Sequence, residues 1–312
     1  MKEFVIGTRG SPLALAQSDL TRAALSKAFP DLRVEVKTFT TRGDQKLDLN
    51  LLKKNEAGGK GLFTKELEDA LLNGSIDVAV HSLKDLPGHN PAGLQLAAVL
   101  ERAPTADVLI TREAADFNAL PQGARIGTSS IRRARQISWL RPDLIIGEWR
   151  GNVQTRLRKL GASEETAGII LAEAGLVRLG FDLSDGILEF EQWRFRVSSL
   201  EAHLLPAIGQ GAIALQSCVG RDDVTLILRA LNHEPTLVCI RAERELQRLL
   251  SGDCSLPVGV RTRLHDGILE MRGILFGVEG TPPIEAQAAG TNPEEVAALL
   301  FAGLEAGASS GS

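Results

Sequence analysis

Short apolar runs alternate with amphipathic stretches over the first two thirds of the chain. Runs at 4–7, 34–39 and 76–80 predict buried strands, and the stretches that begin at Ser11 and at residue 62 have the apolar spacing of helices. Ser11 followed by Pro12 is the pair expected at the N-cap and first position of a helix. Further strands are predicted at 108–111, 125–127, 144–147 and 168–171. This β-α-β alternation favours a largely parallel sheet.

The pattern changes twice in the second half of the chain. Residues 204–216, with the sequence LLPAIGQGAIALQ, predict a crossing back to the first unit. From about Asn232 a long helix over 237–250 precedes a hairpin split by His265-Asp266-Gly267, and 307–312 predict a frayed tail. We therefore predict an α/β protein with two α/β domains joined by a double crossover and a small α+β third domain. The predicted boundaries are 1–100 with 206–230 for the first domain, 105–200 for the second and 233–312 for the third.

Composition narrows the class of protein. Hydrophobic residues make up 44% of the 312 positions and charged residues 24%, which is typical of a globular protein. No apolar run approaches the length of a membrane span, and we see no secretion signal. The three cysteines are too few and too widely spaced for a disulfide framework or a zinc site. We expect a cytoplasmic protein without a bound metal.

Charge is unevenly distributed. Residues 125–159 contain nine basic side chains and two acidic ones, a local charge of +7 in a chain whose net charge is −4. Such a segment is either a solvated basic face or the binding site of an anionic ligand. Nucleic acid is the less favoured anion, because the whole chain is acidic and only 4% aromatic.

Three predicted strands are each followed by a hydroxyl or amide N-cap and an arginine. The segments are TRGSP at 8–12, GTSSIRR at 127–133 and RGNVQTR at 150–156. Unpaired N–H groups at a helix N-terminus and an adjacent guanidinium can together hold a carboxylate. One such cap has a purely structural explanation, but three on one scaffold predict an anion-binding cleft.

Two further segments carry candidate catalytic groups. The strand at 76–80 leads into Ser82, Lys84 and Asp85, which form either a surface turn with an ion pair or a site where Asp85 stabilises a developing cation. His81 fits a hydrogen-bonded, partly buried histidine better than a catalyst. Cys254 is in a glycine- and proline-flanked loop and is either incidental or a nucleophile. Cys218 and Cys239, within apolar runs, fit inert core residues.

Taken together and in order, these segments resemble the porphobilinogen deaminase family from residue 5 to about residue 260. The motifs that carry the resemblance are TRGSPLALAQ, VKTFTTRGD, GGKGLFTKELE, VAVHSLKDLP, GTSSIRR, RPDLII, RGNVQTRL, AGLVRLG, LPAIGQGA and GDCSLPVG. The resemblance implies a transferase of tetrapyrrole and heme biosynthesis, also called hydroxymethylbilane synthase. It implies a monomer that joins four porphobilinogen molecules with loss of ammonia and releases hydroxymethylbilane by hydrolysis. It also implies two domains like those of periplasmic binding proteins and a third that carries the cofactor cysteine.

The resemblance further implies a covalent dipyrromethane cofactor held by a thioether to Cys254, and it makes Asp85 the catalytic residue. Lys60 falls in a loop that covers the cleft in the family. The implied binding residues for cofactor and substrate are Arg9, Ser11, Ser82, Lys84, Ser130, Arg132, Arg133, Arg150, Arg156 and Arg178, with Thr128, Ser129 and Gln210 as polar partners. The main alternative is a non-catalytic, two-lobed anion-binding protein, which would need the arginines but neither Asp85 nor Cys254.

Overall fold

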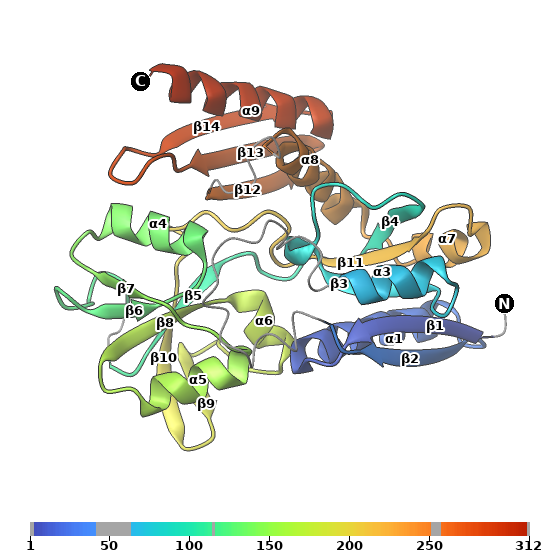
Figure 1. The fold of residues 1–312 in the computed structure, drawn as a ribbon, viewed down its shortest axis with the longest axis horizontal. Helices are drawn as coiled ribbons and strands as arrows, with labels where there is room; N and C mark the ends of the chain where they lie inside the picture. The colour runs from blue at the N-terminus through green and yellow to red at the C-terminus, as the bar shows by residue number, and fades with distance from the viewer. Residues whose placement is uncertain (1–2, 42–63, 114–115, 251–256, 311–312) are drawn as a thin grey trace. The chain divides into compact units, whose positions relative to one another are not determined.

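The computed structural model describes residues 3–41, 64–113, 116–250 and 257–310. The chain forms two compact units, which Figure 1 shows as ribbons. The first unit comprises residues 1–103 and 211–240, and the second comprises 104–210 and 241–312. Each unit is described by itself below.

A five-stranded sheet forms the core of the first unit. Its strand order is β2 (Arg33–Phe39), β1 (Glu3–Arg9), β3 (Val78–Ser82), β11 (Ile213–Cys218) and β4 (Leu94–Val99). β1 pairs in parallel with β2 and β3, whereas β11 is antiparallel to both of its neighbours. The prediction of a largely parallel sheet is therefore correct for β1 to β3. The sheet is mixed because β11, in the segment that crosses back to this unit, runs antiparallel to β3 and β4.

Three helices cover this sheet. Helices α1 (Pro12–Ala28) and α7 (Asp222–Arg229) pack on one face, where Leu25 and Leu228 join a fully buried apolar cluster. Helix α3 (Lys65–Leu72) packs on the other face through Leu67 and Leu71. Apolar residues of each strand alternate between these two layers because successive side chains of a strand point to opposite faces.

The second unit contains a six-stranded mixed sheet. Its strand order is β7 (Ile145–Gly147), β6 (Arg125–Gly127), β8 (Thr166–Ala172), β5 (Asp107–Thr111), β10 (Trp193–Ser199) and β9 (Ile187–Phe190). Helix α4 (Ile131–Leu140) covers one face, and helices α5 (Val153–Ala162) and α6 (Glu173–Arg178) cover the other. The four strands predicted for this region are confirmed. The β9–β10 hairpin is an addition that the sequence analysis did not predict.

A separate three-stranded sheet of β12 (Val258–His265), β13 (Ile268–Leu275) and β14 (Ile284–Gly290) groups with the second unit. The predicted hairpin turn is confirmed, with positive φ angles of 50° at Asp266 and 77° at Gly267. The predicted frayed tail is wrong as far as Ser310, because helix α9 (Pro293–Ser310) continues to that residue. Its residue Gly307 packs so closely on Ile284 that a side chain there would collide. The three-domain boundaries remain a prediction.

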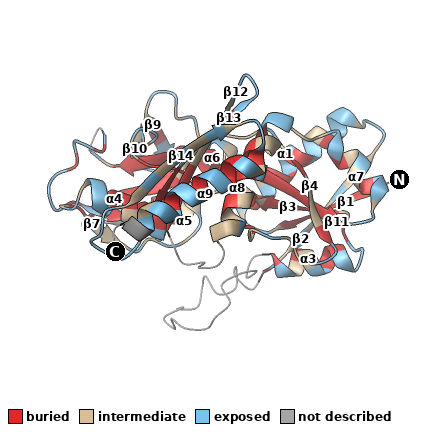
Figure 2. Ribbon diagram, turned by 90° about the horizontal axis from the view of Figure 1, so that it is seen from above, coloured by how far each residue is buried: buried red, intermediate tan, exposed pale blue. Residues whose placement is uncertain are grey.

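Helix α8 (Glu234–Leu250) confirms the long helix predicted after Asn232. Buried residues are concentrated along the strands and on the inner faces of the helices, as Figure 2 shows. Among the helices of the described residues, none is long and apolar enough to cross a bilayer.

Candidate functional site

A pocket in the first unit lies where β1 and β3 end and α1 begins. Four of the predicted site residues line it together: Arg9, Ser11, Ser82 and Asp85. They come from segments about seventy positions apart in the sequence, and the parallel pairing of β1 with β3 places the two strand ends side by side. The expectation that strand ends gather polar side chains is therefore confirmed within this unit.

Asp85 ends a single turn of 3₁₀ helix, η1 (Leu83–Asp85), directly after β3. The Leu83 N–H donates to the Ala212 carbonyl at 3.1 Å, and the Leu86 N–H donates to the Leu83 carbonyl at 2.9 Å. Both leucine side chains are buried in one apolar cluster, while Asp85 is exposed. The turn is thus anchored on both sides of a carboxylate that solvent and ligand can reach. Lys84, on the same turn, is exposed and does not line the pocket.

Several neutral polar side chains line the pocket beside Arg9 and Asp85. The buried amide of Gln17 exchanges two hydrogen bonds with the Ser82 hydroxyl, at 2.8 and 3.1 Å. His81 is buried and lies 3.1 Å from Gln216, from ring Nε2 to amide oxygen. Burial, together with the nearby charge of Arg9, lowers the pKa of His81 to about 4. His81 is therefore hydrogen-bonded, as the sequence predicted, and it is more fully buried than the partly buried residue expected. Gln17 was not predicted as a site residue.

The three predicted N-caps are all present. The Ser11 hydroxyl accepts a hydrogen bond from the Ala14 N–H at 3.3 Å. Ser130 accepts from the Arg133 N–H at 3.5 Å, and the Asn152 side chain accepts from the Thr155 N–H at 2.8 Å. Each side chain thus has a structural role at a helix start. Of the three, only Ser11 belongs to the pocket beside Asp85.

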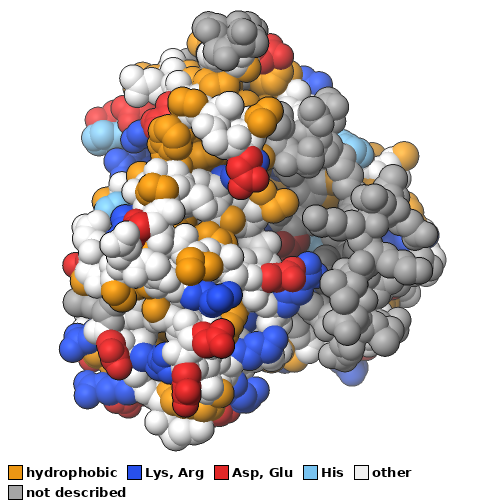
Figure 3. Space-filling view, turned by 60° about the vertical axis from the view of Figure 1, so that its left-hand side comes forward, with side chains coloured by type: hydrophobic (Ala, Val, Ile, Leu, Met, Phe, Trp, Pro, Cys, Tyr) orange, Lys and Arg blue, Asp and Glu red, His pale blue; other side chains and the backbone are white. Residues whose placement is uncertain are grey.

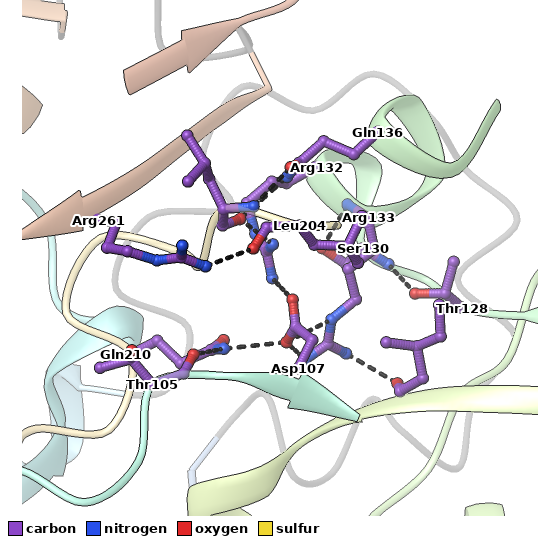
Figure 4. Close-up of polar contacts among 12 residues, drawn as sticks. Thr105, Asp107, Thr128, Ser130, Arg132, Arg133, Gln136, Leu204, Gln210 and Arg261 are labelled. Atoms are coloured by element: carbon purple, nitrogen blue, oxygen red, sulfur yellow. Dashed lines mark hydrogen bonds and ion pairs between the residues drawn. The ribbon is translucent and has the colours of Figure 1, made fainter. Parts of the chain in front are cut away.

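Arg132 and Arg133, at the start of α4, lie buried around Asp107 (Figure 4). Arg133 donates to one Asp107 oxygen from Nε at 3.1 Å and from Nη2 at 2.7 Å. Arg132 Nη2 lies 2.8 Å from the other oxygen. Each guanidinium also donates to a main-chain carbonyl, that of Leu205 for Arg132 and that of Ile170 for Arg133.

Gln210 completes this arrangement. Its side-chain amide donates to Asp107 at 2.9 Å and to the Thr105 carbonyl at 2.7 Å (Figure 4). Burial alone would raise the pKa of Asp107, but the charges of Arg133 and Arg132 and the hydrogen bonds hold it well below its usual range. Burial lowers the pKa of Arg132 despite the opposing charge of Asp107. The sequence analysis missed Asp107, although an acidic residue that opens a buried apolar strand needs a cationic partner.

The remaining predicted arginines differ in their surroundings. Burial lowers the pKa of Arg156 to about 10, with a contribution from the charge of Arg133, and burial lowers that of Arg178 to about 10. Arg156 donates to the Gly151 carbonyl at 2.7 Å, and none of the carboxylates that the structure describes pairs with it. A half-buried guanidinium in this setting favours the approach of an anion. Arg150 is exposed and pairs with Glu148.

The basic segment is partly a solvated face. Three of its arginines pair with exposed or half-exposed acids: Arg141 with Asp143, Arg150 with Glu148 and Arg158 with Glu191. Figure 3 shows basic side chains interspersed with acidic ones on one face of the molecule. The charge that can serve a ligand is therefore smaller than the sequence count of +7. Surface pairs of this kind contribute little to stability.

Two predicted polar partners form hydrogen bonds with the backbone of the second unit. The Thr128 hydroxyl accepts from the Ser130 N–H at 3.2 Å, and the Ser129 hydroxyl accepts from the Trp149 N–H at 3.0 Å. Lys60 and Cys254 lie outside the described residues. Cys239 is buried and Cys218 partly so, and burial raises the pKa of the Cys218 thiol. Among the described residues no group of acidic, histidine and cysteine side chains could hold a metal ion.

Comparison with known proteins identifies the family. A family model described as "Porphobilinogen deaminase, dipyromethane cofactor binding domain" matches residues 4–226, and one for the C-terminal domain matches 237–305. The chain belongs to the porphobilinogen deaminase family. A porphobilinogen deaminase of Syntrophobacter fumaroxidans is 45% identical over 92% of this chain and 88% of its own length. One from Neisseria meningitidis serogroup A is 43% identical over the same shares. The family makes this chain a transferase of tetrapyrrole biosynthesis with a dipyrromethane cofactor.

Among solved structures, the methionine-binding protein MetQ matches 74% of this chain and 90% of its own at 10% identity, with a TM-score of 0.42. The sheets of this chain form two α/β units, with a smaller third sheet in the C-terminal region. The predicted fold class is confirmed.

The described residues fit a dipyrromethane. Each pyrrole of that group carries an acetate and a propionate, so its binding needs several fixed cations and hydroxyl donors. Arg9, Ser11 and Ser82 line the pocket of the first unit, and Arg156 of the second unit is a half-buried cation with no acidic partner among the described side chains. The donors thus have the chemistry that such a polyanion requires.

Proposed function

We propose that this chain joins four porphobilinogen molecules head to tail, with loss of ammonia from each, and then releases hydroxymethylbilane by hydrolysis. The observation that carries the proposal is the pocket where Asp85 lies with Arg9, Ser11 and Ser82 in a member of the porphobilinogen deaminase family. When bound, the dipyrromethane supplies the pyrrole carbon to which the first substrate is joined.

Asp85 is the catalytic residue of this proposal. Loss of ammonia from porphobilinogen leaves positive charge spread over the pyrrole nitrogen and its exocyclic carbon. A fixed carboxylate stabilises that cation more than it stabilises the neutral substrate, and this difference lowers the barrier. The anchored turn supports the role, because Leu83 and Leu86 hold the backbone while the Asp85 side chain stays accessible.

The arginines and hydroxyls bind the acetates and propionates of substrate and cofactor. The proposed binding set contains Arg9, Ser11, Ser82, Lys84, Thr128, Ser129, Ser130, Arg132, Arg133, Arg150, Arg156, Arg178 and Gln210, with Lys60 in the covering loop. Guanidinium groups suit this task because their planar donors match the two oxygens of a carboxylate. The half-buried position of Arg156 supports its place in the set.

Cys254 is the proposed attachment point of the dipyrromethane. The intact mass of the purified protein tests this assignment, since attachment adds two porphobilinogen units less two molecules of ammonia. We expect Cys254→Ala to fold but to lack both this mass and activity. Cys218→Ala and Cys239→Ala are the matched controls and should retain both. An active, modified Cys254→Ala protein would overturn the assignment.

The same measurement separates the enzyme from a non-catalytic anion-binding protein, which has no use for a covalent dipyrromethane. Wild-type protein that carries no added mass and forms no product would favour that alternative. We also propose that the enzyme is a cytoplasmic monomer. Light scattering of the purified holoenzyme tests the oligomeric state, and fractionation of the source cells tests the location.

A further inference from the structure

Asp107 is a fully buried carboxylate surrounded by N–H donors. It is 1% exposed, it accepts hydrogen bonds from Arg133 and Gln210, and it forms an ion pair with Arg132. Each arginine is held on a second side by a main-chain carbonyl. The two guanidiniums are therefore fixed in direction as well as in position (Figure 4).

The two guanidiniums are like charges close to one another, because both form ion pairs with Asp107. The charge of Arg133 also contributes to the lowered pKa of Arg156. Arg132 and Arg133 are each less than 10% exposed, and bringing such charges together out of water is unfavourable unless a counter-charge lies among them. Asp107 is that counter-charge.

We propose that Asp107 is a positioning residue for the proposed carboxylate-binding arginines, which it holds in place while the site waits for its anion. The proposal rests on the proposed function of Arg132 and Arg133. With one carboxylate between two guanidiniums, the group keeps a net charge of about +1 and its geometry is set in advance. Without Asp107 the guanidiniums repel one another and turn towards water, so substrate binding must first gather them again.

The test compares wild-type holoenzyme with Asp107→Asn, in which the shape is kept and the charge is lost. We expect KM for porphobilinogen to rise about tenfold with kcat within about twofold, because binding of the substrate carboxylates is weakened. Asp107→Glu keeps the charge but displaces it by one methylene, so it should recover part of the affinity. If Asp107→Asn does not fold, Asp107→Glu carries the same test with a smaller rise in KM.

Two controls make the result specific. Asp143→Asn removes a carboxylate from another Asp–Arg pair of the same unit, 2.7 Å from Arg141, and should leave KM unchanged. Phenylglyoxal labelling, mapped by mass spectrometry, should modify Arg132 and Arg133 slowly in the wild type and faster in Asp107→Asn.

An unchanged KM in Asp107→Asn would give Asp107 a merely structural role, and a lowered KM would show that net charge outweighs geometry. Either result overturns the proposal, as does labelling of both arginines at the wild-type rate. If the wild type itself makes no product, the proposed function fails, while the labelling still reports whether Asp107 holds the arginines.

Discussion

Two aspartates at strand ends show how the two units use the same side chain differently. Asp85 follows β3 in the first unit and is exposed, in a pocket lined by Arg9 and by neutral polar and apolar side chains. Asp107 opens β5 in the second unit and is buried among two arginines and a glutamine. The first carboxylate is accessible to an incoming cation, whereas the second already contacts three side chains of its own chain.

A buried carboxylate mainly affects the stability of the protein, whereas an exposed one in a pocket can affect the reaction rate without affecting stability. Removing one partner from a buried ion pair leaves an uncompensated charge, which costs stability. Removing an exposed carboxylate costs little stability but can cost rate if the group stabilises a transition state. Substitution of Asp107 should therefore change mainly stability, and substitution of Asp85 mainly rate.

The largest expected effect is on the stability of Asp107→Asn. We expect its free energy of unfolding to fall by about 3–5 kcal/mol at pH 7, because Arg132 and Arg133 lose their shared buried partner. The lowered pKa of Asp107 means that its contribution is complete above the unfolded value near 4 and is lost as pH falls further. Urea denaturation at pH 7 and between pH 5 and 3 measures both effects.

The control for this prediction is Asp143→Asn, whose solvent-accessible pair with Arg141 should contribute far less to stability than the buried pairs of Asp107. Equal losses in the two variants would contradict the distinction between buried and exposed pairs.

Asp85→Asn should lower the reaction rate and leave the stability of the protein almost unchanged. We expect kcat to fall about 100-fold or more, roughly 3 kcal/mol, with KM and the unfolding free energy close to wild type. Asp85→Glu should retain a trace of activity. Single-turnover kinetics provides the measurement, and a condensation rate near that of wild type would leave Asp85 as a structural turn residue.

Structural features that depend on neighbouring residues, such as helix caps and strands, could be predicted from the sequence. The caps at Ser11, Ser130 and Asn152 act on N–H groups three positions away, so local residue types suffice to locate them. Apolar spacing likewise located most strands of both sheets, although it missed β4 and the β9–β10 hairpin.

Contacts between distant residues could not be predicted in this way. Gln17 meets Ser82 across 65 positions, and Asp107 meets Gln210 across 103. The direction of β11 depends on pairing with β3, more than a hundred positions earlier. Such partners are set by the tertiary fold, and nothing in the local pattern around either residue identifies the other.

His81, which lines the pocket with Asp85, should give the stability of the protein a pH dependence of intermediate size. Its pKa is lowered by burial to about 4 from an ordinary value of 6.5, so the folded protein binds fewer protons than the unfolded chain between these values. Stability should therefore decrease as pH falls from 6.5 to 4, by up to about 3 kcal/mol from this group. His81→Gln should lack this component. Chemical denaturation across the range checks it, and identical pH slopes for both proteins would contradict a buried neutral histidine.

The smallest effects come from the helix caps, and they test whether a cap can also bind ligand. Asn152→Ala should cost about 1 kcal/mol of stability, and Ser11→Ala somewhat less because its cap hydrogen bond is longer, 3.3 Å against 2.8 Å. Only Ser11 lines the pocket beside Asp85, so only Ser11→Ala should also raise KM for porphobilinogen, by about fivefold. Thermal unfolding measures the stability of each variant, and steady-state kinetics measures its KM. If KM is unchanged in both variants, the Ser11 hydroxyl acts only as a helix cap. If KM rises equally in both, helix stability controls the affinity, and a ligand contact of Ser11 does not.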